Sequence, residues 1–277
     1  MEKKTIIGMI VPTVDNPFFA SLVCQVERVL KAQGFGLLVC SSANDAETEK
    51  DNFRLLLQSS VRGILCVSGL SALPEGLVPE DCPLVWIDRV PESSRPIPWV
   101  ANDDAQAMEE AADYLIEKGC KNILLLPGFL AEGQQSPRVA GYRKALEAHE
   151  IPFREEYVLR RSGKQSTEAE TEELVQSILR RGLRIDGILA SSDRSAFGAI
   201  AALRSVGLYV PEDVKLICFD NSPYSTMATP AITALDRNPD RLAQTACQLL
   251  LRRLAGKAEL PIQNVVPVSV VKRDSTR

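Results

Sequence analysis

Histidine is almost absent from this sequence, because His149 is the only one among 277 residues. Histidine is the side chain that most readily exchanges protons near neutral pH, and it is the commonest metal ligand. A single histidine, placed at the polar end of a helical pattern, argues against histidine-based catalysis and against a histidine-rich metal site. We therefore expect no catalytic residues, no metal site and no cofactor.

Paired cysteine motifs are also missing. None of the seven cysteines forms a CxxC pair, and their number is odd. Several stand inside apolar stretches such as LLVC and GILCVSG. We interpret them as small buried hydrophobic residues in a reducing compartment rather than as disulfides or metal ligands. This predicts a cytoplasmic protein.

The chain lacks the features of membrane, DNA-binding and nucleotide-binding proteins. No apolar run approaches the ~18 residues that suggest a membrane span, and MEKKTIIG leads straight into a strand pattern without a signal peptide. With 32 basic and 36 acidic residues and no basic cluster, these residues alone are not expected to hold DNA. No GxGxxG, GxxxxGKS/T or GxSxG motif occurs, which opposes an enzyme on an α/β fold.

What the chain does contain is a regular alternation of strand and helix patterns. Strands are expected at 6–11, 36–40, 63–67, 84–87, 122–126, 187–190, 214–219 and 265–271, and helices at 16–33, 47–60, 103–118, 136–150, 167–181, 193–206 and 240–255. This order predicts an α/β fold with parallel sheets and helices on both faces. The pattern divides into two comparable halves, which share the last helix and strand.

The stretch Thr5–Phe19 suggests where a ligand would bind. A buried strand stops at Pro12, and Asn16 and Pro17 form a helix start signal. In open α/β sheets, ligands bind just beyond the carboxyl ends of strands. Asn16, Phe18 and Phe19 therefore offer an amide and two aromatic rings at such a position. The alternative is that the phenylalanines belong to the core.

Five motifs in order resemble the effector-binding core of a LacI/GalR-type bacterial transcription regulator. They are NPFF, VWIDR (85–89), SPRVAGYRKAL (136–146), SDRSAFGAIAALRSVGLYVPEDVKLICFD (192–220) and VVKRDST (270–276). The resemblance implies the periplasmic-binding-protein type I fold, in which two Rossmann-like lobes joined by three crossovers hold a ligand between them. The N-terminal lobe would comprise 5–101 and 236–264, and the C-terminal lobe 102–235 and 265–277. Only three residues precede Lys4, so we expect a truncated chain without the helix-turn-helix domain.

The resemblance also assigns ligand contacts in the first half of the chain. Asn16 would hydrogen-bond the ligand and one of the two phenylalanines would stack on it. Asp88 and Arg89 would touch hydroxyl groups, or alternatively form a local ion pair. Arg138, whose planar fork suits two adjacent oxygens, would bind the ligand or form a salt bridge between the lobes.

The remaining candidates follow the later strands. Ser192 and Asp193 stand where many relatives have Asn-Asp, and Asp193 could instead cap its helix. Asp220 matches the family's ligand carboxylate, with Phe219 beside it. Relatives often carry glutamine at the position of Arg237. Asp236 and Arg237 would therefore make ligand contacts that differ from those of relatives, or would form an ion pair at the hinge.

These candidates balance three aspartates, Asp88, Asp220 and Asp236, against three arginines, Arg89, Arg138 and Arg237. Such a balance favours a neutral sugar or polyol over a free phosphate. The sequence therefore predicts a sugar-sensing homodimeric core, which would reach operator DNA only through a missing N-terminal domain and would not contact a membrane. A solute-binding protein of a sugar transporter is the alternative.

Overall fold

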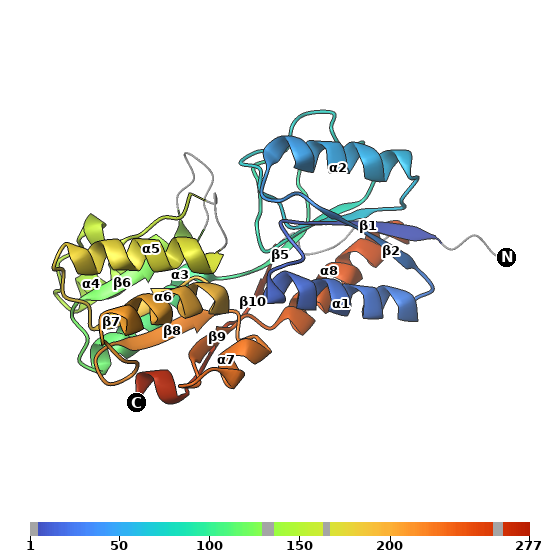
Figure 1. Ribbon diagram of the computed structural model, residues 1–277. Helices are drawn as coiled ribbons and strands as arrows, with labels where there is room; N and C mark the ends of the chain where they lie inside the picture. The colour runs from blue at the N-terminus through green and yellow to red at the C-terminus, as the bar shows by residue number, and fades with distance from the viewer. Residues whose placement is uncertain (1–4, 129–135, 163–166, 257–262) are drawn as a thin grey trace. The chain divides into compact units, whose positions relative to one another are not determined.

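The structure, a computed structural model, describes residues 5–128, 136–162, 167–256 and 263–277. It is an α/β fold that divides into two compact units (Figure 1). The N-terminal unit comprises Met1–Asn102 and Asn238–Pro267, and the C-terminal unit comprises Asp103–Arg237 and Val268–Arg277. The chain thus crosses three times from one unit to the other. The unit boundaries predicted from the sequence lie one to three residues before the boundaries in the structure.

The N-terminal unit is built on a six-stranded parallel sheet with the order β10-β5-β4-β3-β1-β2. Its strands are β1 (Ile6–Val11), β2 (Gly36–Ser41), β3 (Ile64–Cys66), β4 (Leu84–Ile87), β5 (Trp99–Asn102) and β10 (Gln263–Val266), and its helices are α1 (Pro17–Ala32), α2 (Ala46–Gln58) and α8 (Pro239–Leu254). Because all six strands run in one direction, their carboxyl ends meet at one edge, here named the carboxyl edge of the sheet.

Successive side chains of β1 face two different helical layers. Met9 and Val11 belong to the core cluster that includes α1 and α8, whereas Ile10 packs in the cluster that contains Phe53 of α2. Figure 1 shows α2 on one side of this sheet and α1 with α8 on the other. Burial on both faces explains why the strands are almost continuously apolar in sequence.

The C-terminal unit repeats this architecture on a five-stranded sheet with the order β11-β9-β8-β7-β6. Its strands are β6 (Ile123–Leu126), β7 (Gly187–Ala190), β8 (Lys215–Phe219), β9 (Thr233–Asp236) and β11 (Ser269–Val271), and its helices are α3 (Asp104–Glu117), α4 (Pro137–Ala148), α5 (Thr167–Arg180), α6 (Asp193–Ser205) and α7 (Pro223–Met227). Ile217 faces the cluster that contains α3 and α4, and Leu216 faces the cluster that contains α5 and α6. Strands β6 to β9 are parallel, so this sheet also has a carboxyl edge.

Two details correct the expectations from sequence. The strand predicted at 265–271 is two strands in different units, β10 and β11, and Pro267 lies between them. Proline has no N–H to donate to a ladder, so a single strand across this position is disfavoured. In addition β11 pairs antiparallel with β9, so the second sheet is not wholly parallel. Strands β5 (WVAN) and β9 (TALD) lack the continuous apolar run that marks strands of equal length such as β4 and β6, and helix α7 spans only five residues, so none of the three was predicted.

Helices α3 and α4 approach so closely that one glycine is required between them. A Cβ atom added to Gly141 of α4 would lie 1.9 Å from the carbonyl oxygen of Ala105 in α3. A backbone atom is not free to move aside as a flexible side chain would be, so the two helices would have to separate. The packing of this face of the sheet therefore depends on Gly141.

We expect Gly141→Ala to lower the free energy of unfolding by about 2 kcal/mol or more, as overpacked substitutions do. Gly36→Ala is the matched control, since its added Cβ would be 3.9 Å from the nearest atom and its backbone needs no positive φ. Urea unfolding of both variants measures the difference. Equal stability of the two variants would contradict the close packing of α3 on α4.

Candidate functional site

The carboxyl edge of the N-terminal sheet begins with the turn between β1 and α1. Asn16 is the N-cap of α1, as predicted, and its Oδ1 accepts a hydrogen bond of 2.8 Å from the amide of Phe18. Phe18 and Phe19 are 2% and 6% exposed, and their rings meet edge to face in the core of this unit. Both rings therefore pack in the core, which was the alternative reading of these residues.

Asp88 and Arg89 follow β4 at the same edge. Asp88 adopts a positive φ of 67°, a conformation that non-glycine residues rarely use. Its amide donates to the carbonyl of Val100, which fixes the turn against β5. The Arg89 guanidinium donates to Oδ1 of Asn44 at 3.2 Å and lies 5.9 Å from the centre of the Phe19 ring. The turn thus holds a carboxylate and a guanidinium at the end of β4.

A buried carboxylate, Glu49 of α2, supports the neighbouring loop. Its side chain is 0% exposed and accepts hydrogen bonds from Ser68 Oγ at 2.5 Å and from the Gly69 amide at 2.7 Å. Burial is the largest influence and raises the pKa of the Glu49 carboxyl above its usual range, while hydrogen bonds from Ser68 and Gly69 and the charge of Arg89 act in the opposite direction. Glu49 therefore fixes the loop that follows β3.

Arg138 occupies the carboxyl edge of the C-terminal sheet. Its Nε donates to Oδ2 of Asp104 at 2.8 Å, and its Nη1 donates to the carbonyl of Ser191 at 3.3 Å. The guanidinium carbon lies 3.9 Å from the centre of the Phe219 ring, which is almost fully buried. An ion pair, a backbone contact and a ring together fix the plane of this guanidinium. No hydrogen bond joins its Nη2 to any residue in the described part of the chain.

Asp220 and Arg237 form a buried ion pair at the ends of β8 and β9. The Arg237 Nη1 lies 3.5 Å from the Asp220 Oδ1, and the two side chains are only 4% and 5% exposed. Asp236 accepts a hydrogen bond of 3.1 Å from the side-chain amide of Asn221. Arg273 in turn donates to the Asn221 Oδ1 at 2.6 Å. These contacts tie the turn after β8 to the last strands of the sheet.

Ser192, and not Asp193, caps helix α6, which corrects the alternative that Asp193 caps its helix. Ser192 is the N-cap of α6 and its Oγ accepts from the amide of Ser195, so Asp193 is not the cap. Asp193 is instead the first helical residue, 1% exposed, and its carboxylate contacts Ser222 and Cys218. A serine at the N-cap position satisfies the amide and leaves the aspartate available for another contact.

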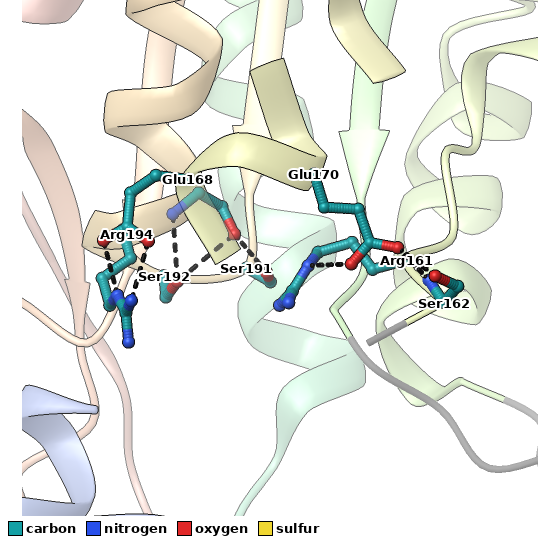
Figure 2. Close-up of polar contacts among 8 residues, drawn as sticks. Arg161, Ser162, Glu168, Glu170, Ser191, Ser192 and Arg194 are labelled. Atoms are coloured by element: carbon teal, nitrogen blue, oxygen red, sulfur yellow. Dashed lines mark hydrogen bonds and ion pairs between the residues drawn. The ribbon is translucent and has the colours of Figure 1, made fainter. Parts of the chain in front are cut away.

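Two further arginine–carboxylate pairs fix the start of α5 at this edge (Figure 2). Glu168 accepts two hydrogen bonds, 2.6 and 2.8 Å long, from the Arg194 guanidinium. Glu170 accepts from Arg161 at 3.1 Å and from the amide and hydroxyl of Ser162. Together with the two pairs described above, four arginines at this edge each have a carboxylate partner.

The comparison with known proteins identifies the family. The sequence profile described as "Periplasmic binding protein-like domain" matches residues 112–276. The HTH-type transcriptional repressor PurR of Yersinia pestis bv. Antiqua is 31% identical over 284 residues, which cover 97% of this chain and 79% of that protein. The chain belongs to the LacI family of transcriptional regulators. This bears out the resemblance found in the motifs.

Solved structures of this LacI family share the fold over almost the whole chain. The transcription regulator CcpA of Lactococcus lactis is 27% identical, with a TM-score of 0.86 over 99% of this chain and 100% of that one. A LacI family transcriptional regulator from Enterococcus faecium with bound ribose is 25% identical, with a TM-score of 0.83 over 98% of both chains. The chain is thus the effector-binding core of a LacI-type regulator rather than a transporter's solute-binding protein.

The described residues of this LacI-family core contain neither a candidate membrane-spanning helix nor a candidate metal site. Among residues 5–128, 136–162, 167–256 and 263–277, no helix has the length and apolar character needed to span a bilayer. In the same ranges no three acidic, histidine or cysteine side chains gather in a way that could hold a metal ion. All seven cysteines are free thiols, and Cys24 is exposed.

Sequence reasoning missed four acidic residues: Glu49 in the N-terminal unit, and Asp104, Glu168 and Glu170 in the C-terminal unit. A signal existed for Glu49, because Phe53 and Leu56 follow it at i+4 and i+7 on the buried face of α2. No comparable signal existed for Asp104, Glu168 and Glu170. They lie in the first turns of helices, where acidic residues are expected on electrostatic grounds alone.

We expect Glu49→Gln to change how stability depends on pH. Because the folded-state pKa of Glu49 is raised, this carboxyl favours the folded state below the ordinary glutamate value of about 4.3, and the contribution is lost as the pH rises through the folded-state value. Glutamine has no proton to lose. Relative to wild type, the variant should therefore be more stable at about pH 7 than at about pH 4.

Urea unfolding at a series of pH values gives the two free energies of unfolding. Glu47→Gln is the control on the same helix, since the Glu47 side chain is 75% exposed. A stability difference for Glu49→Gln that stays constant with pH would show that the carboxyl is not destabilised by burial.

Proposed function

We propose that this LacI-family core binds a small neutral polyhydroxy ligand, a sugar or polyol, at the carboxyl edges of its two sheets. The observation that carries the proposal is the pairing of charge at the C-terminal edge. Arg138, Arg161, Arg194 and Arg237 are paired with Asp104, Glu170, Glu168 and Asp220. An anionic ligand would need unpaired positive charge, whereas a neutral ligand needs only oriented donors and acceptors.

The proposed contacts are Asn16, Asp88, Arg89, Arg138, Ser192, Phe219, Asp220, Asp236 and Arg237, all named from the sequence. Phe18, Phe19 and Asp193 are buried and are not proposed as contacts. Arg138 is the central donor, because its plane is fixed and its Nη2 has two N–H groups available for hydroxyl oxygens. Asp88 and Asp220 supply acceptors for hydroxyl protons. The bound ribose in the Enterococcus faecium regulator supports a sugar of similar size.

The proposed role is sensing rather than catalysis. The relatives are transcriptional repressors and regulators, and every ionisable group described at the C-terminal edge has a structural partner. A ligand that prefers one arrangement of the two units shifts the population toward it by its difference in affinity. In a protein where this core is joined to a helix-turn-helix segment, that shift would alter operator binding.

We also propose that the core is a homodimer through an apolar surface of the C-terminal unit. Val206 and Tyr209 after α6, and Tyr224 and Met227 of α7, are each more than half exposed. Arg204 of α6 donates to the carbonyl of Thr229, which joins the end of α6 to the segment after α7. An exposed apolar group of this kind on a soluble protein marks an interaction surface.

The ligand proposal is tested by thermal shift with pentoses, hexoses, disaccharides, polyols and their phosphate esters. Ligands that bind only the native state raise the melting temperature. We expect one neutral sugar to do so and its phosphate ester not to. We also expect Arg138→Met to weaken the affinity for that sugar about tenfold or more, the loss that follows from a charged hydrogen bond.

Arg143→Met is the matched control, because Arg143 also lies on α4 and its guanidinium carbon is 3.7 Å from the centre of the Phe153 ring. It should change stability without changing affinity. A phosphate ester that binds better than the sugar would overturn the proposed ligand class.

The dimer is tested by light scattering. We expect Met227→Arg to shift the protein toward monomer, because Met227 is 78% exposed and a buried unpaired charge would oppose association. Glu147→Arg, an exposed charge change on α4, should leave the molecular mass unchanged. A wild-type protein that is monomeric at all concentrations measured would refute the dimer.

A further inference from the structure

The turn after β8 holds two consecutive residues in an unusual backbone conformation. Asp220 has a φ of 92° and Asn221 a φ of 52°. Asparagine and aspartate tolerate positive φ better than most residues, but such a turn still needs support from its surroundings. The same turn brings the Asp220 carboxylate to Arg237, so its conformation decides where that carboxylate lies.

The support behind this turn comes from Asp193. Its Oδ2 accepts a hydrogen bond of 3.2 Å from the amide of Ser222, the residue that directly follows the turn. Its Oδ1 accepts from the thiol of Cys218 at 3.2 Å, two residues before Asp220 on β8. A single carboxylate therefore joins the strand on one side of the turn to the backbone on the other side.

Asp193 is well suited to this role and poorly suited to contact a ligand. It is 1% exposed, and both of its oxygens already have partners. It is the first residue of α6, where the helix N-terminus favours a negative charge. Burial is the largest influence on the adjacent Cys218 thiol and raises its pKa. The charge of Asp220 raises this pKa further, and the charge of Arg273 lowers it.

We propose that Asp193 is a positioning residue, which holds the Asp220–Asn221 turn so that the Asp220 carboxylate is presented to the ligand. The ligand part of this inference rests on the proposed function above. The positioning part concerns only the hydrogen bond to Ser222 and is independent of any ligand.

Three variants separate positioning from direct contact. Asp193→Ala removes both hydrogen bonds. Asp193→Asn keeps an acceptor for the Ser222 amide, and its NH2 group can donate to the Cys218 sulfur. Asp186→Ala is the matched control. Asp186 directly precedes β7, at the opposite edge of the sheet, and its carboxylate accepts hydrogen bonds from the backbone amides of Lys121 and Asn122.

Hydrogen exchange of the Ser222 amide, followed by NMR, reports positioning without a ligand. We expect exchange at least tenfold faster in Asp193→Ala, relative to the amides of β8, and unchanged in Asp193→Asn and Asp186→Ala. Affinity for the sugar found by thermal shift should fall at least tenfold in Asp193→Ala and less than threefold in Asp193→Asn. Asp193→Ser, too short to bridge both partners, replaces the alanine variant if that variant does not fold.

The outcomes distinguish the two proposals. Unchanged Ser222 exchange in Asp193→Ala would overturn the positioning role, whether or not a sugar binds. Equal loss of affinity in Asp193→Asn and Asp193→Ala, with exchange still slow in the former, would instead make Asp193 a direct ligand contact. If the wild type binds no sugar while exchange behaves as expected, the proposed ligand is wrong and the positioning role stands.

Discussion

A charged side chain can be buried only when an opposite charge or several hydrogen bonds are buried with it, because leaving water costs several kcal/mol per ion. This constraint governs both carboxyl edges. In the C-terminal unit it produces arginine–carboxylate pairs such as Arg237 with Asp220, whose side chains are both about 95% buried. In the N-terminal unit it surrounds Glu49 with Ser68, Gly69 and the charge of Arg89. Both edges are therefore polar, and the four arginines described at the C-terminal edge each have a carboxylate partner.

The same constraint shapes the backbone at each edge. Asp88 after β4 and Asp220 after β8 both adopt positive φ, and both turns are fixed by hydrogen bonds from their amides to the next strand. Behind each edge a helix supplies a buried acid, Glu49 in α2 and Asp193 in α6. Each acid accepts hydrogen bonds from a loop amide and from a strand cysteine. The two units thus build a rigid carboxyl edge by the same physical route.

Much of this fold could be predicted from the sequence. The apolar runs of β1, β4 and β7 and the start signal at Asn16 and Pro17 are local properties, and the structure confirms them. The division of 265–271 into β10 and β11 was not predicted, because it depends on pairing with strands more than thirty residues away. The contacts of Asp193 were missed for a similar reason. Its partners Cys218 and Ser222 lie 25 and 29 residues further along the chain, and no local pattern links them.

The central claim is that the paired charges leave a site for a neutral ligand. The most direct measurement is the dissociation constant of the bound sugar by calorimetry over a range of salt, from about 0.05 to about 0.5 M, where screening of exposed charges changes strongly. Because the arginines are already paired and the ligand carries no charge, the account predicts a dissociation constant that changes less than about twofold. A loss of affinity of about tenfold or more with added salt would show unpaired charge at the site and would contradict the account.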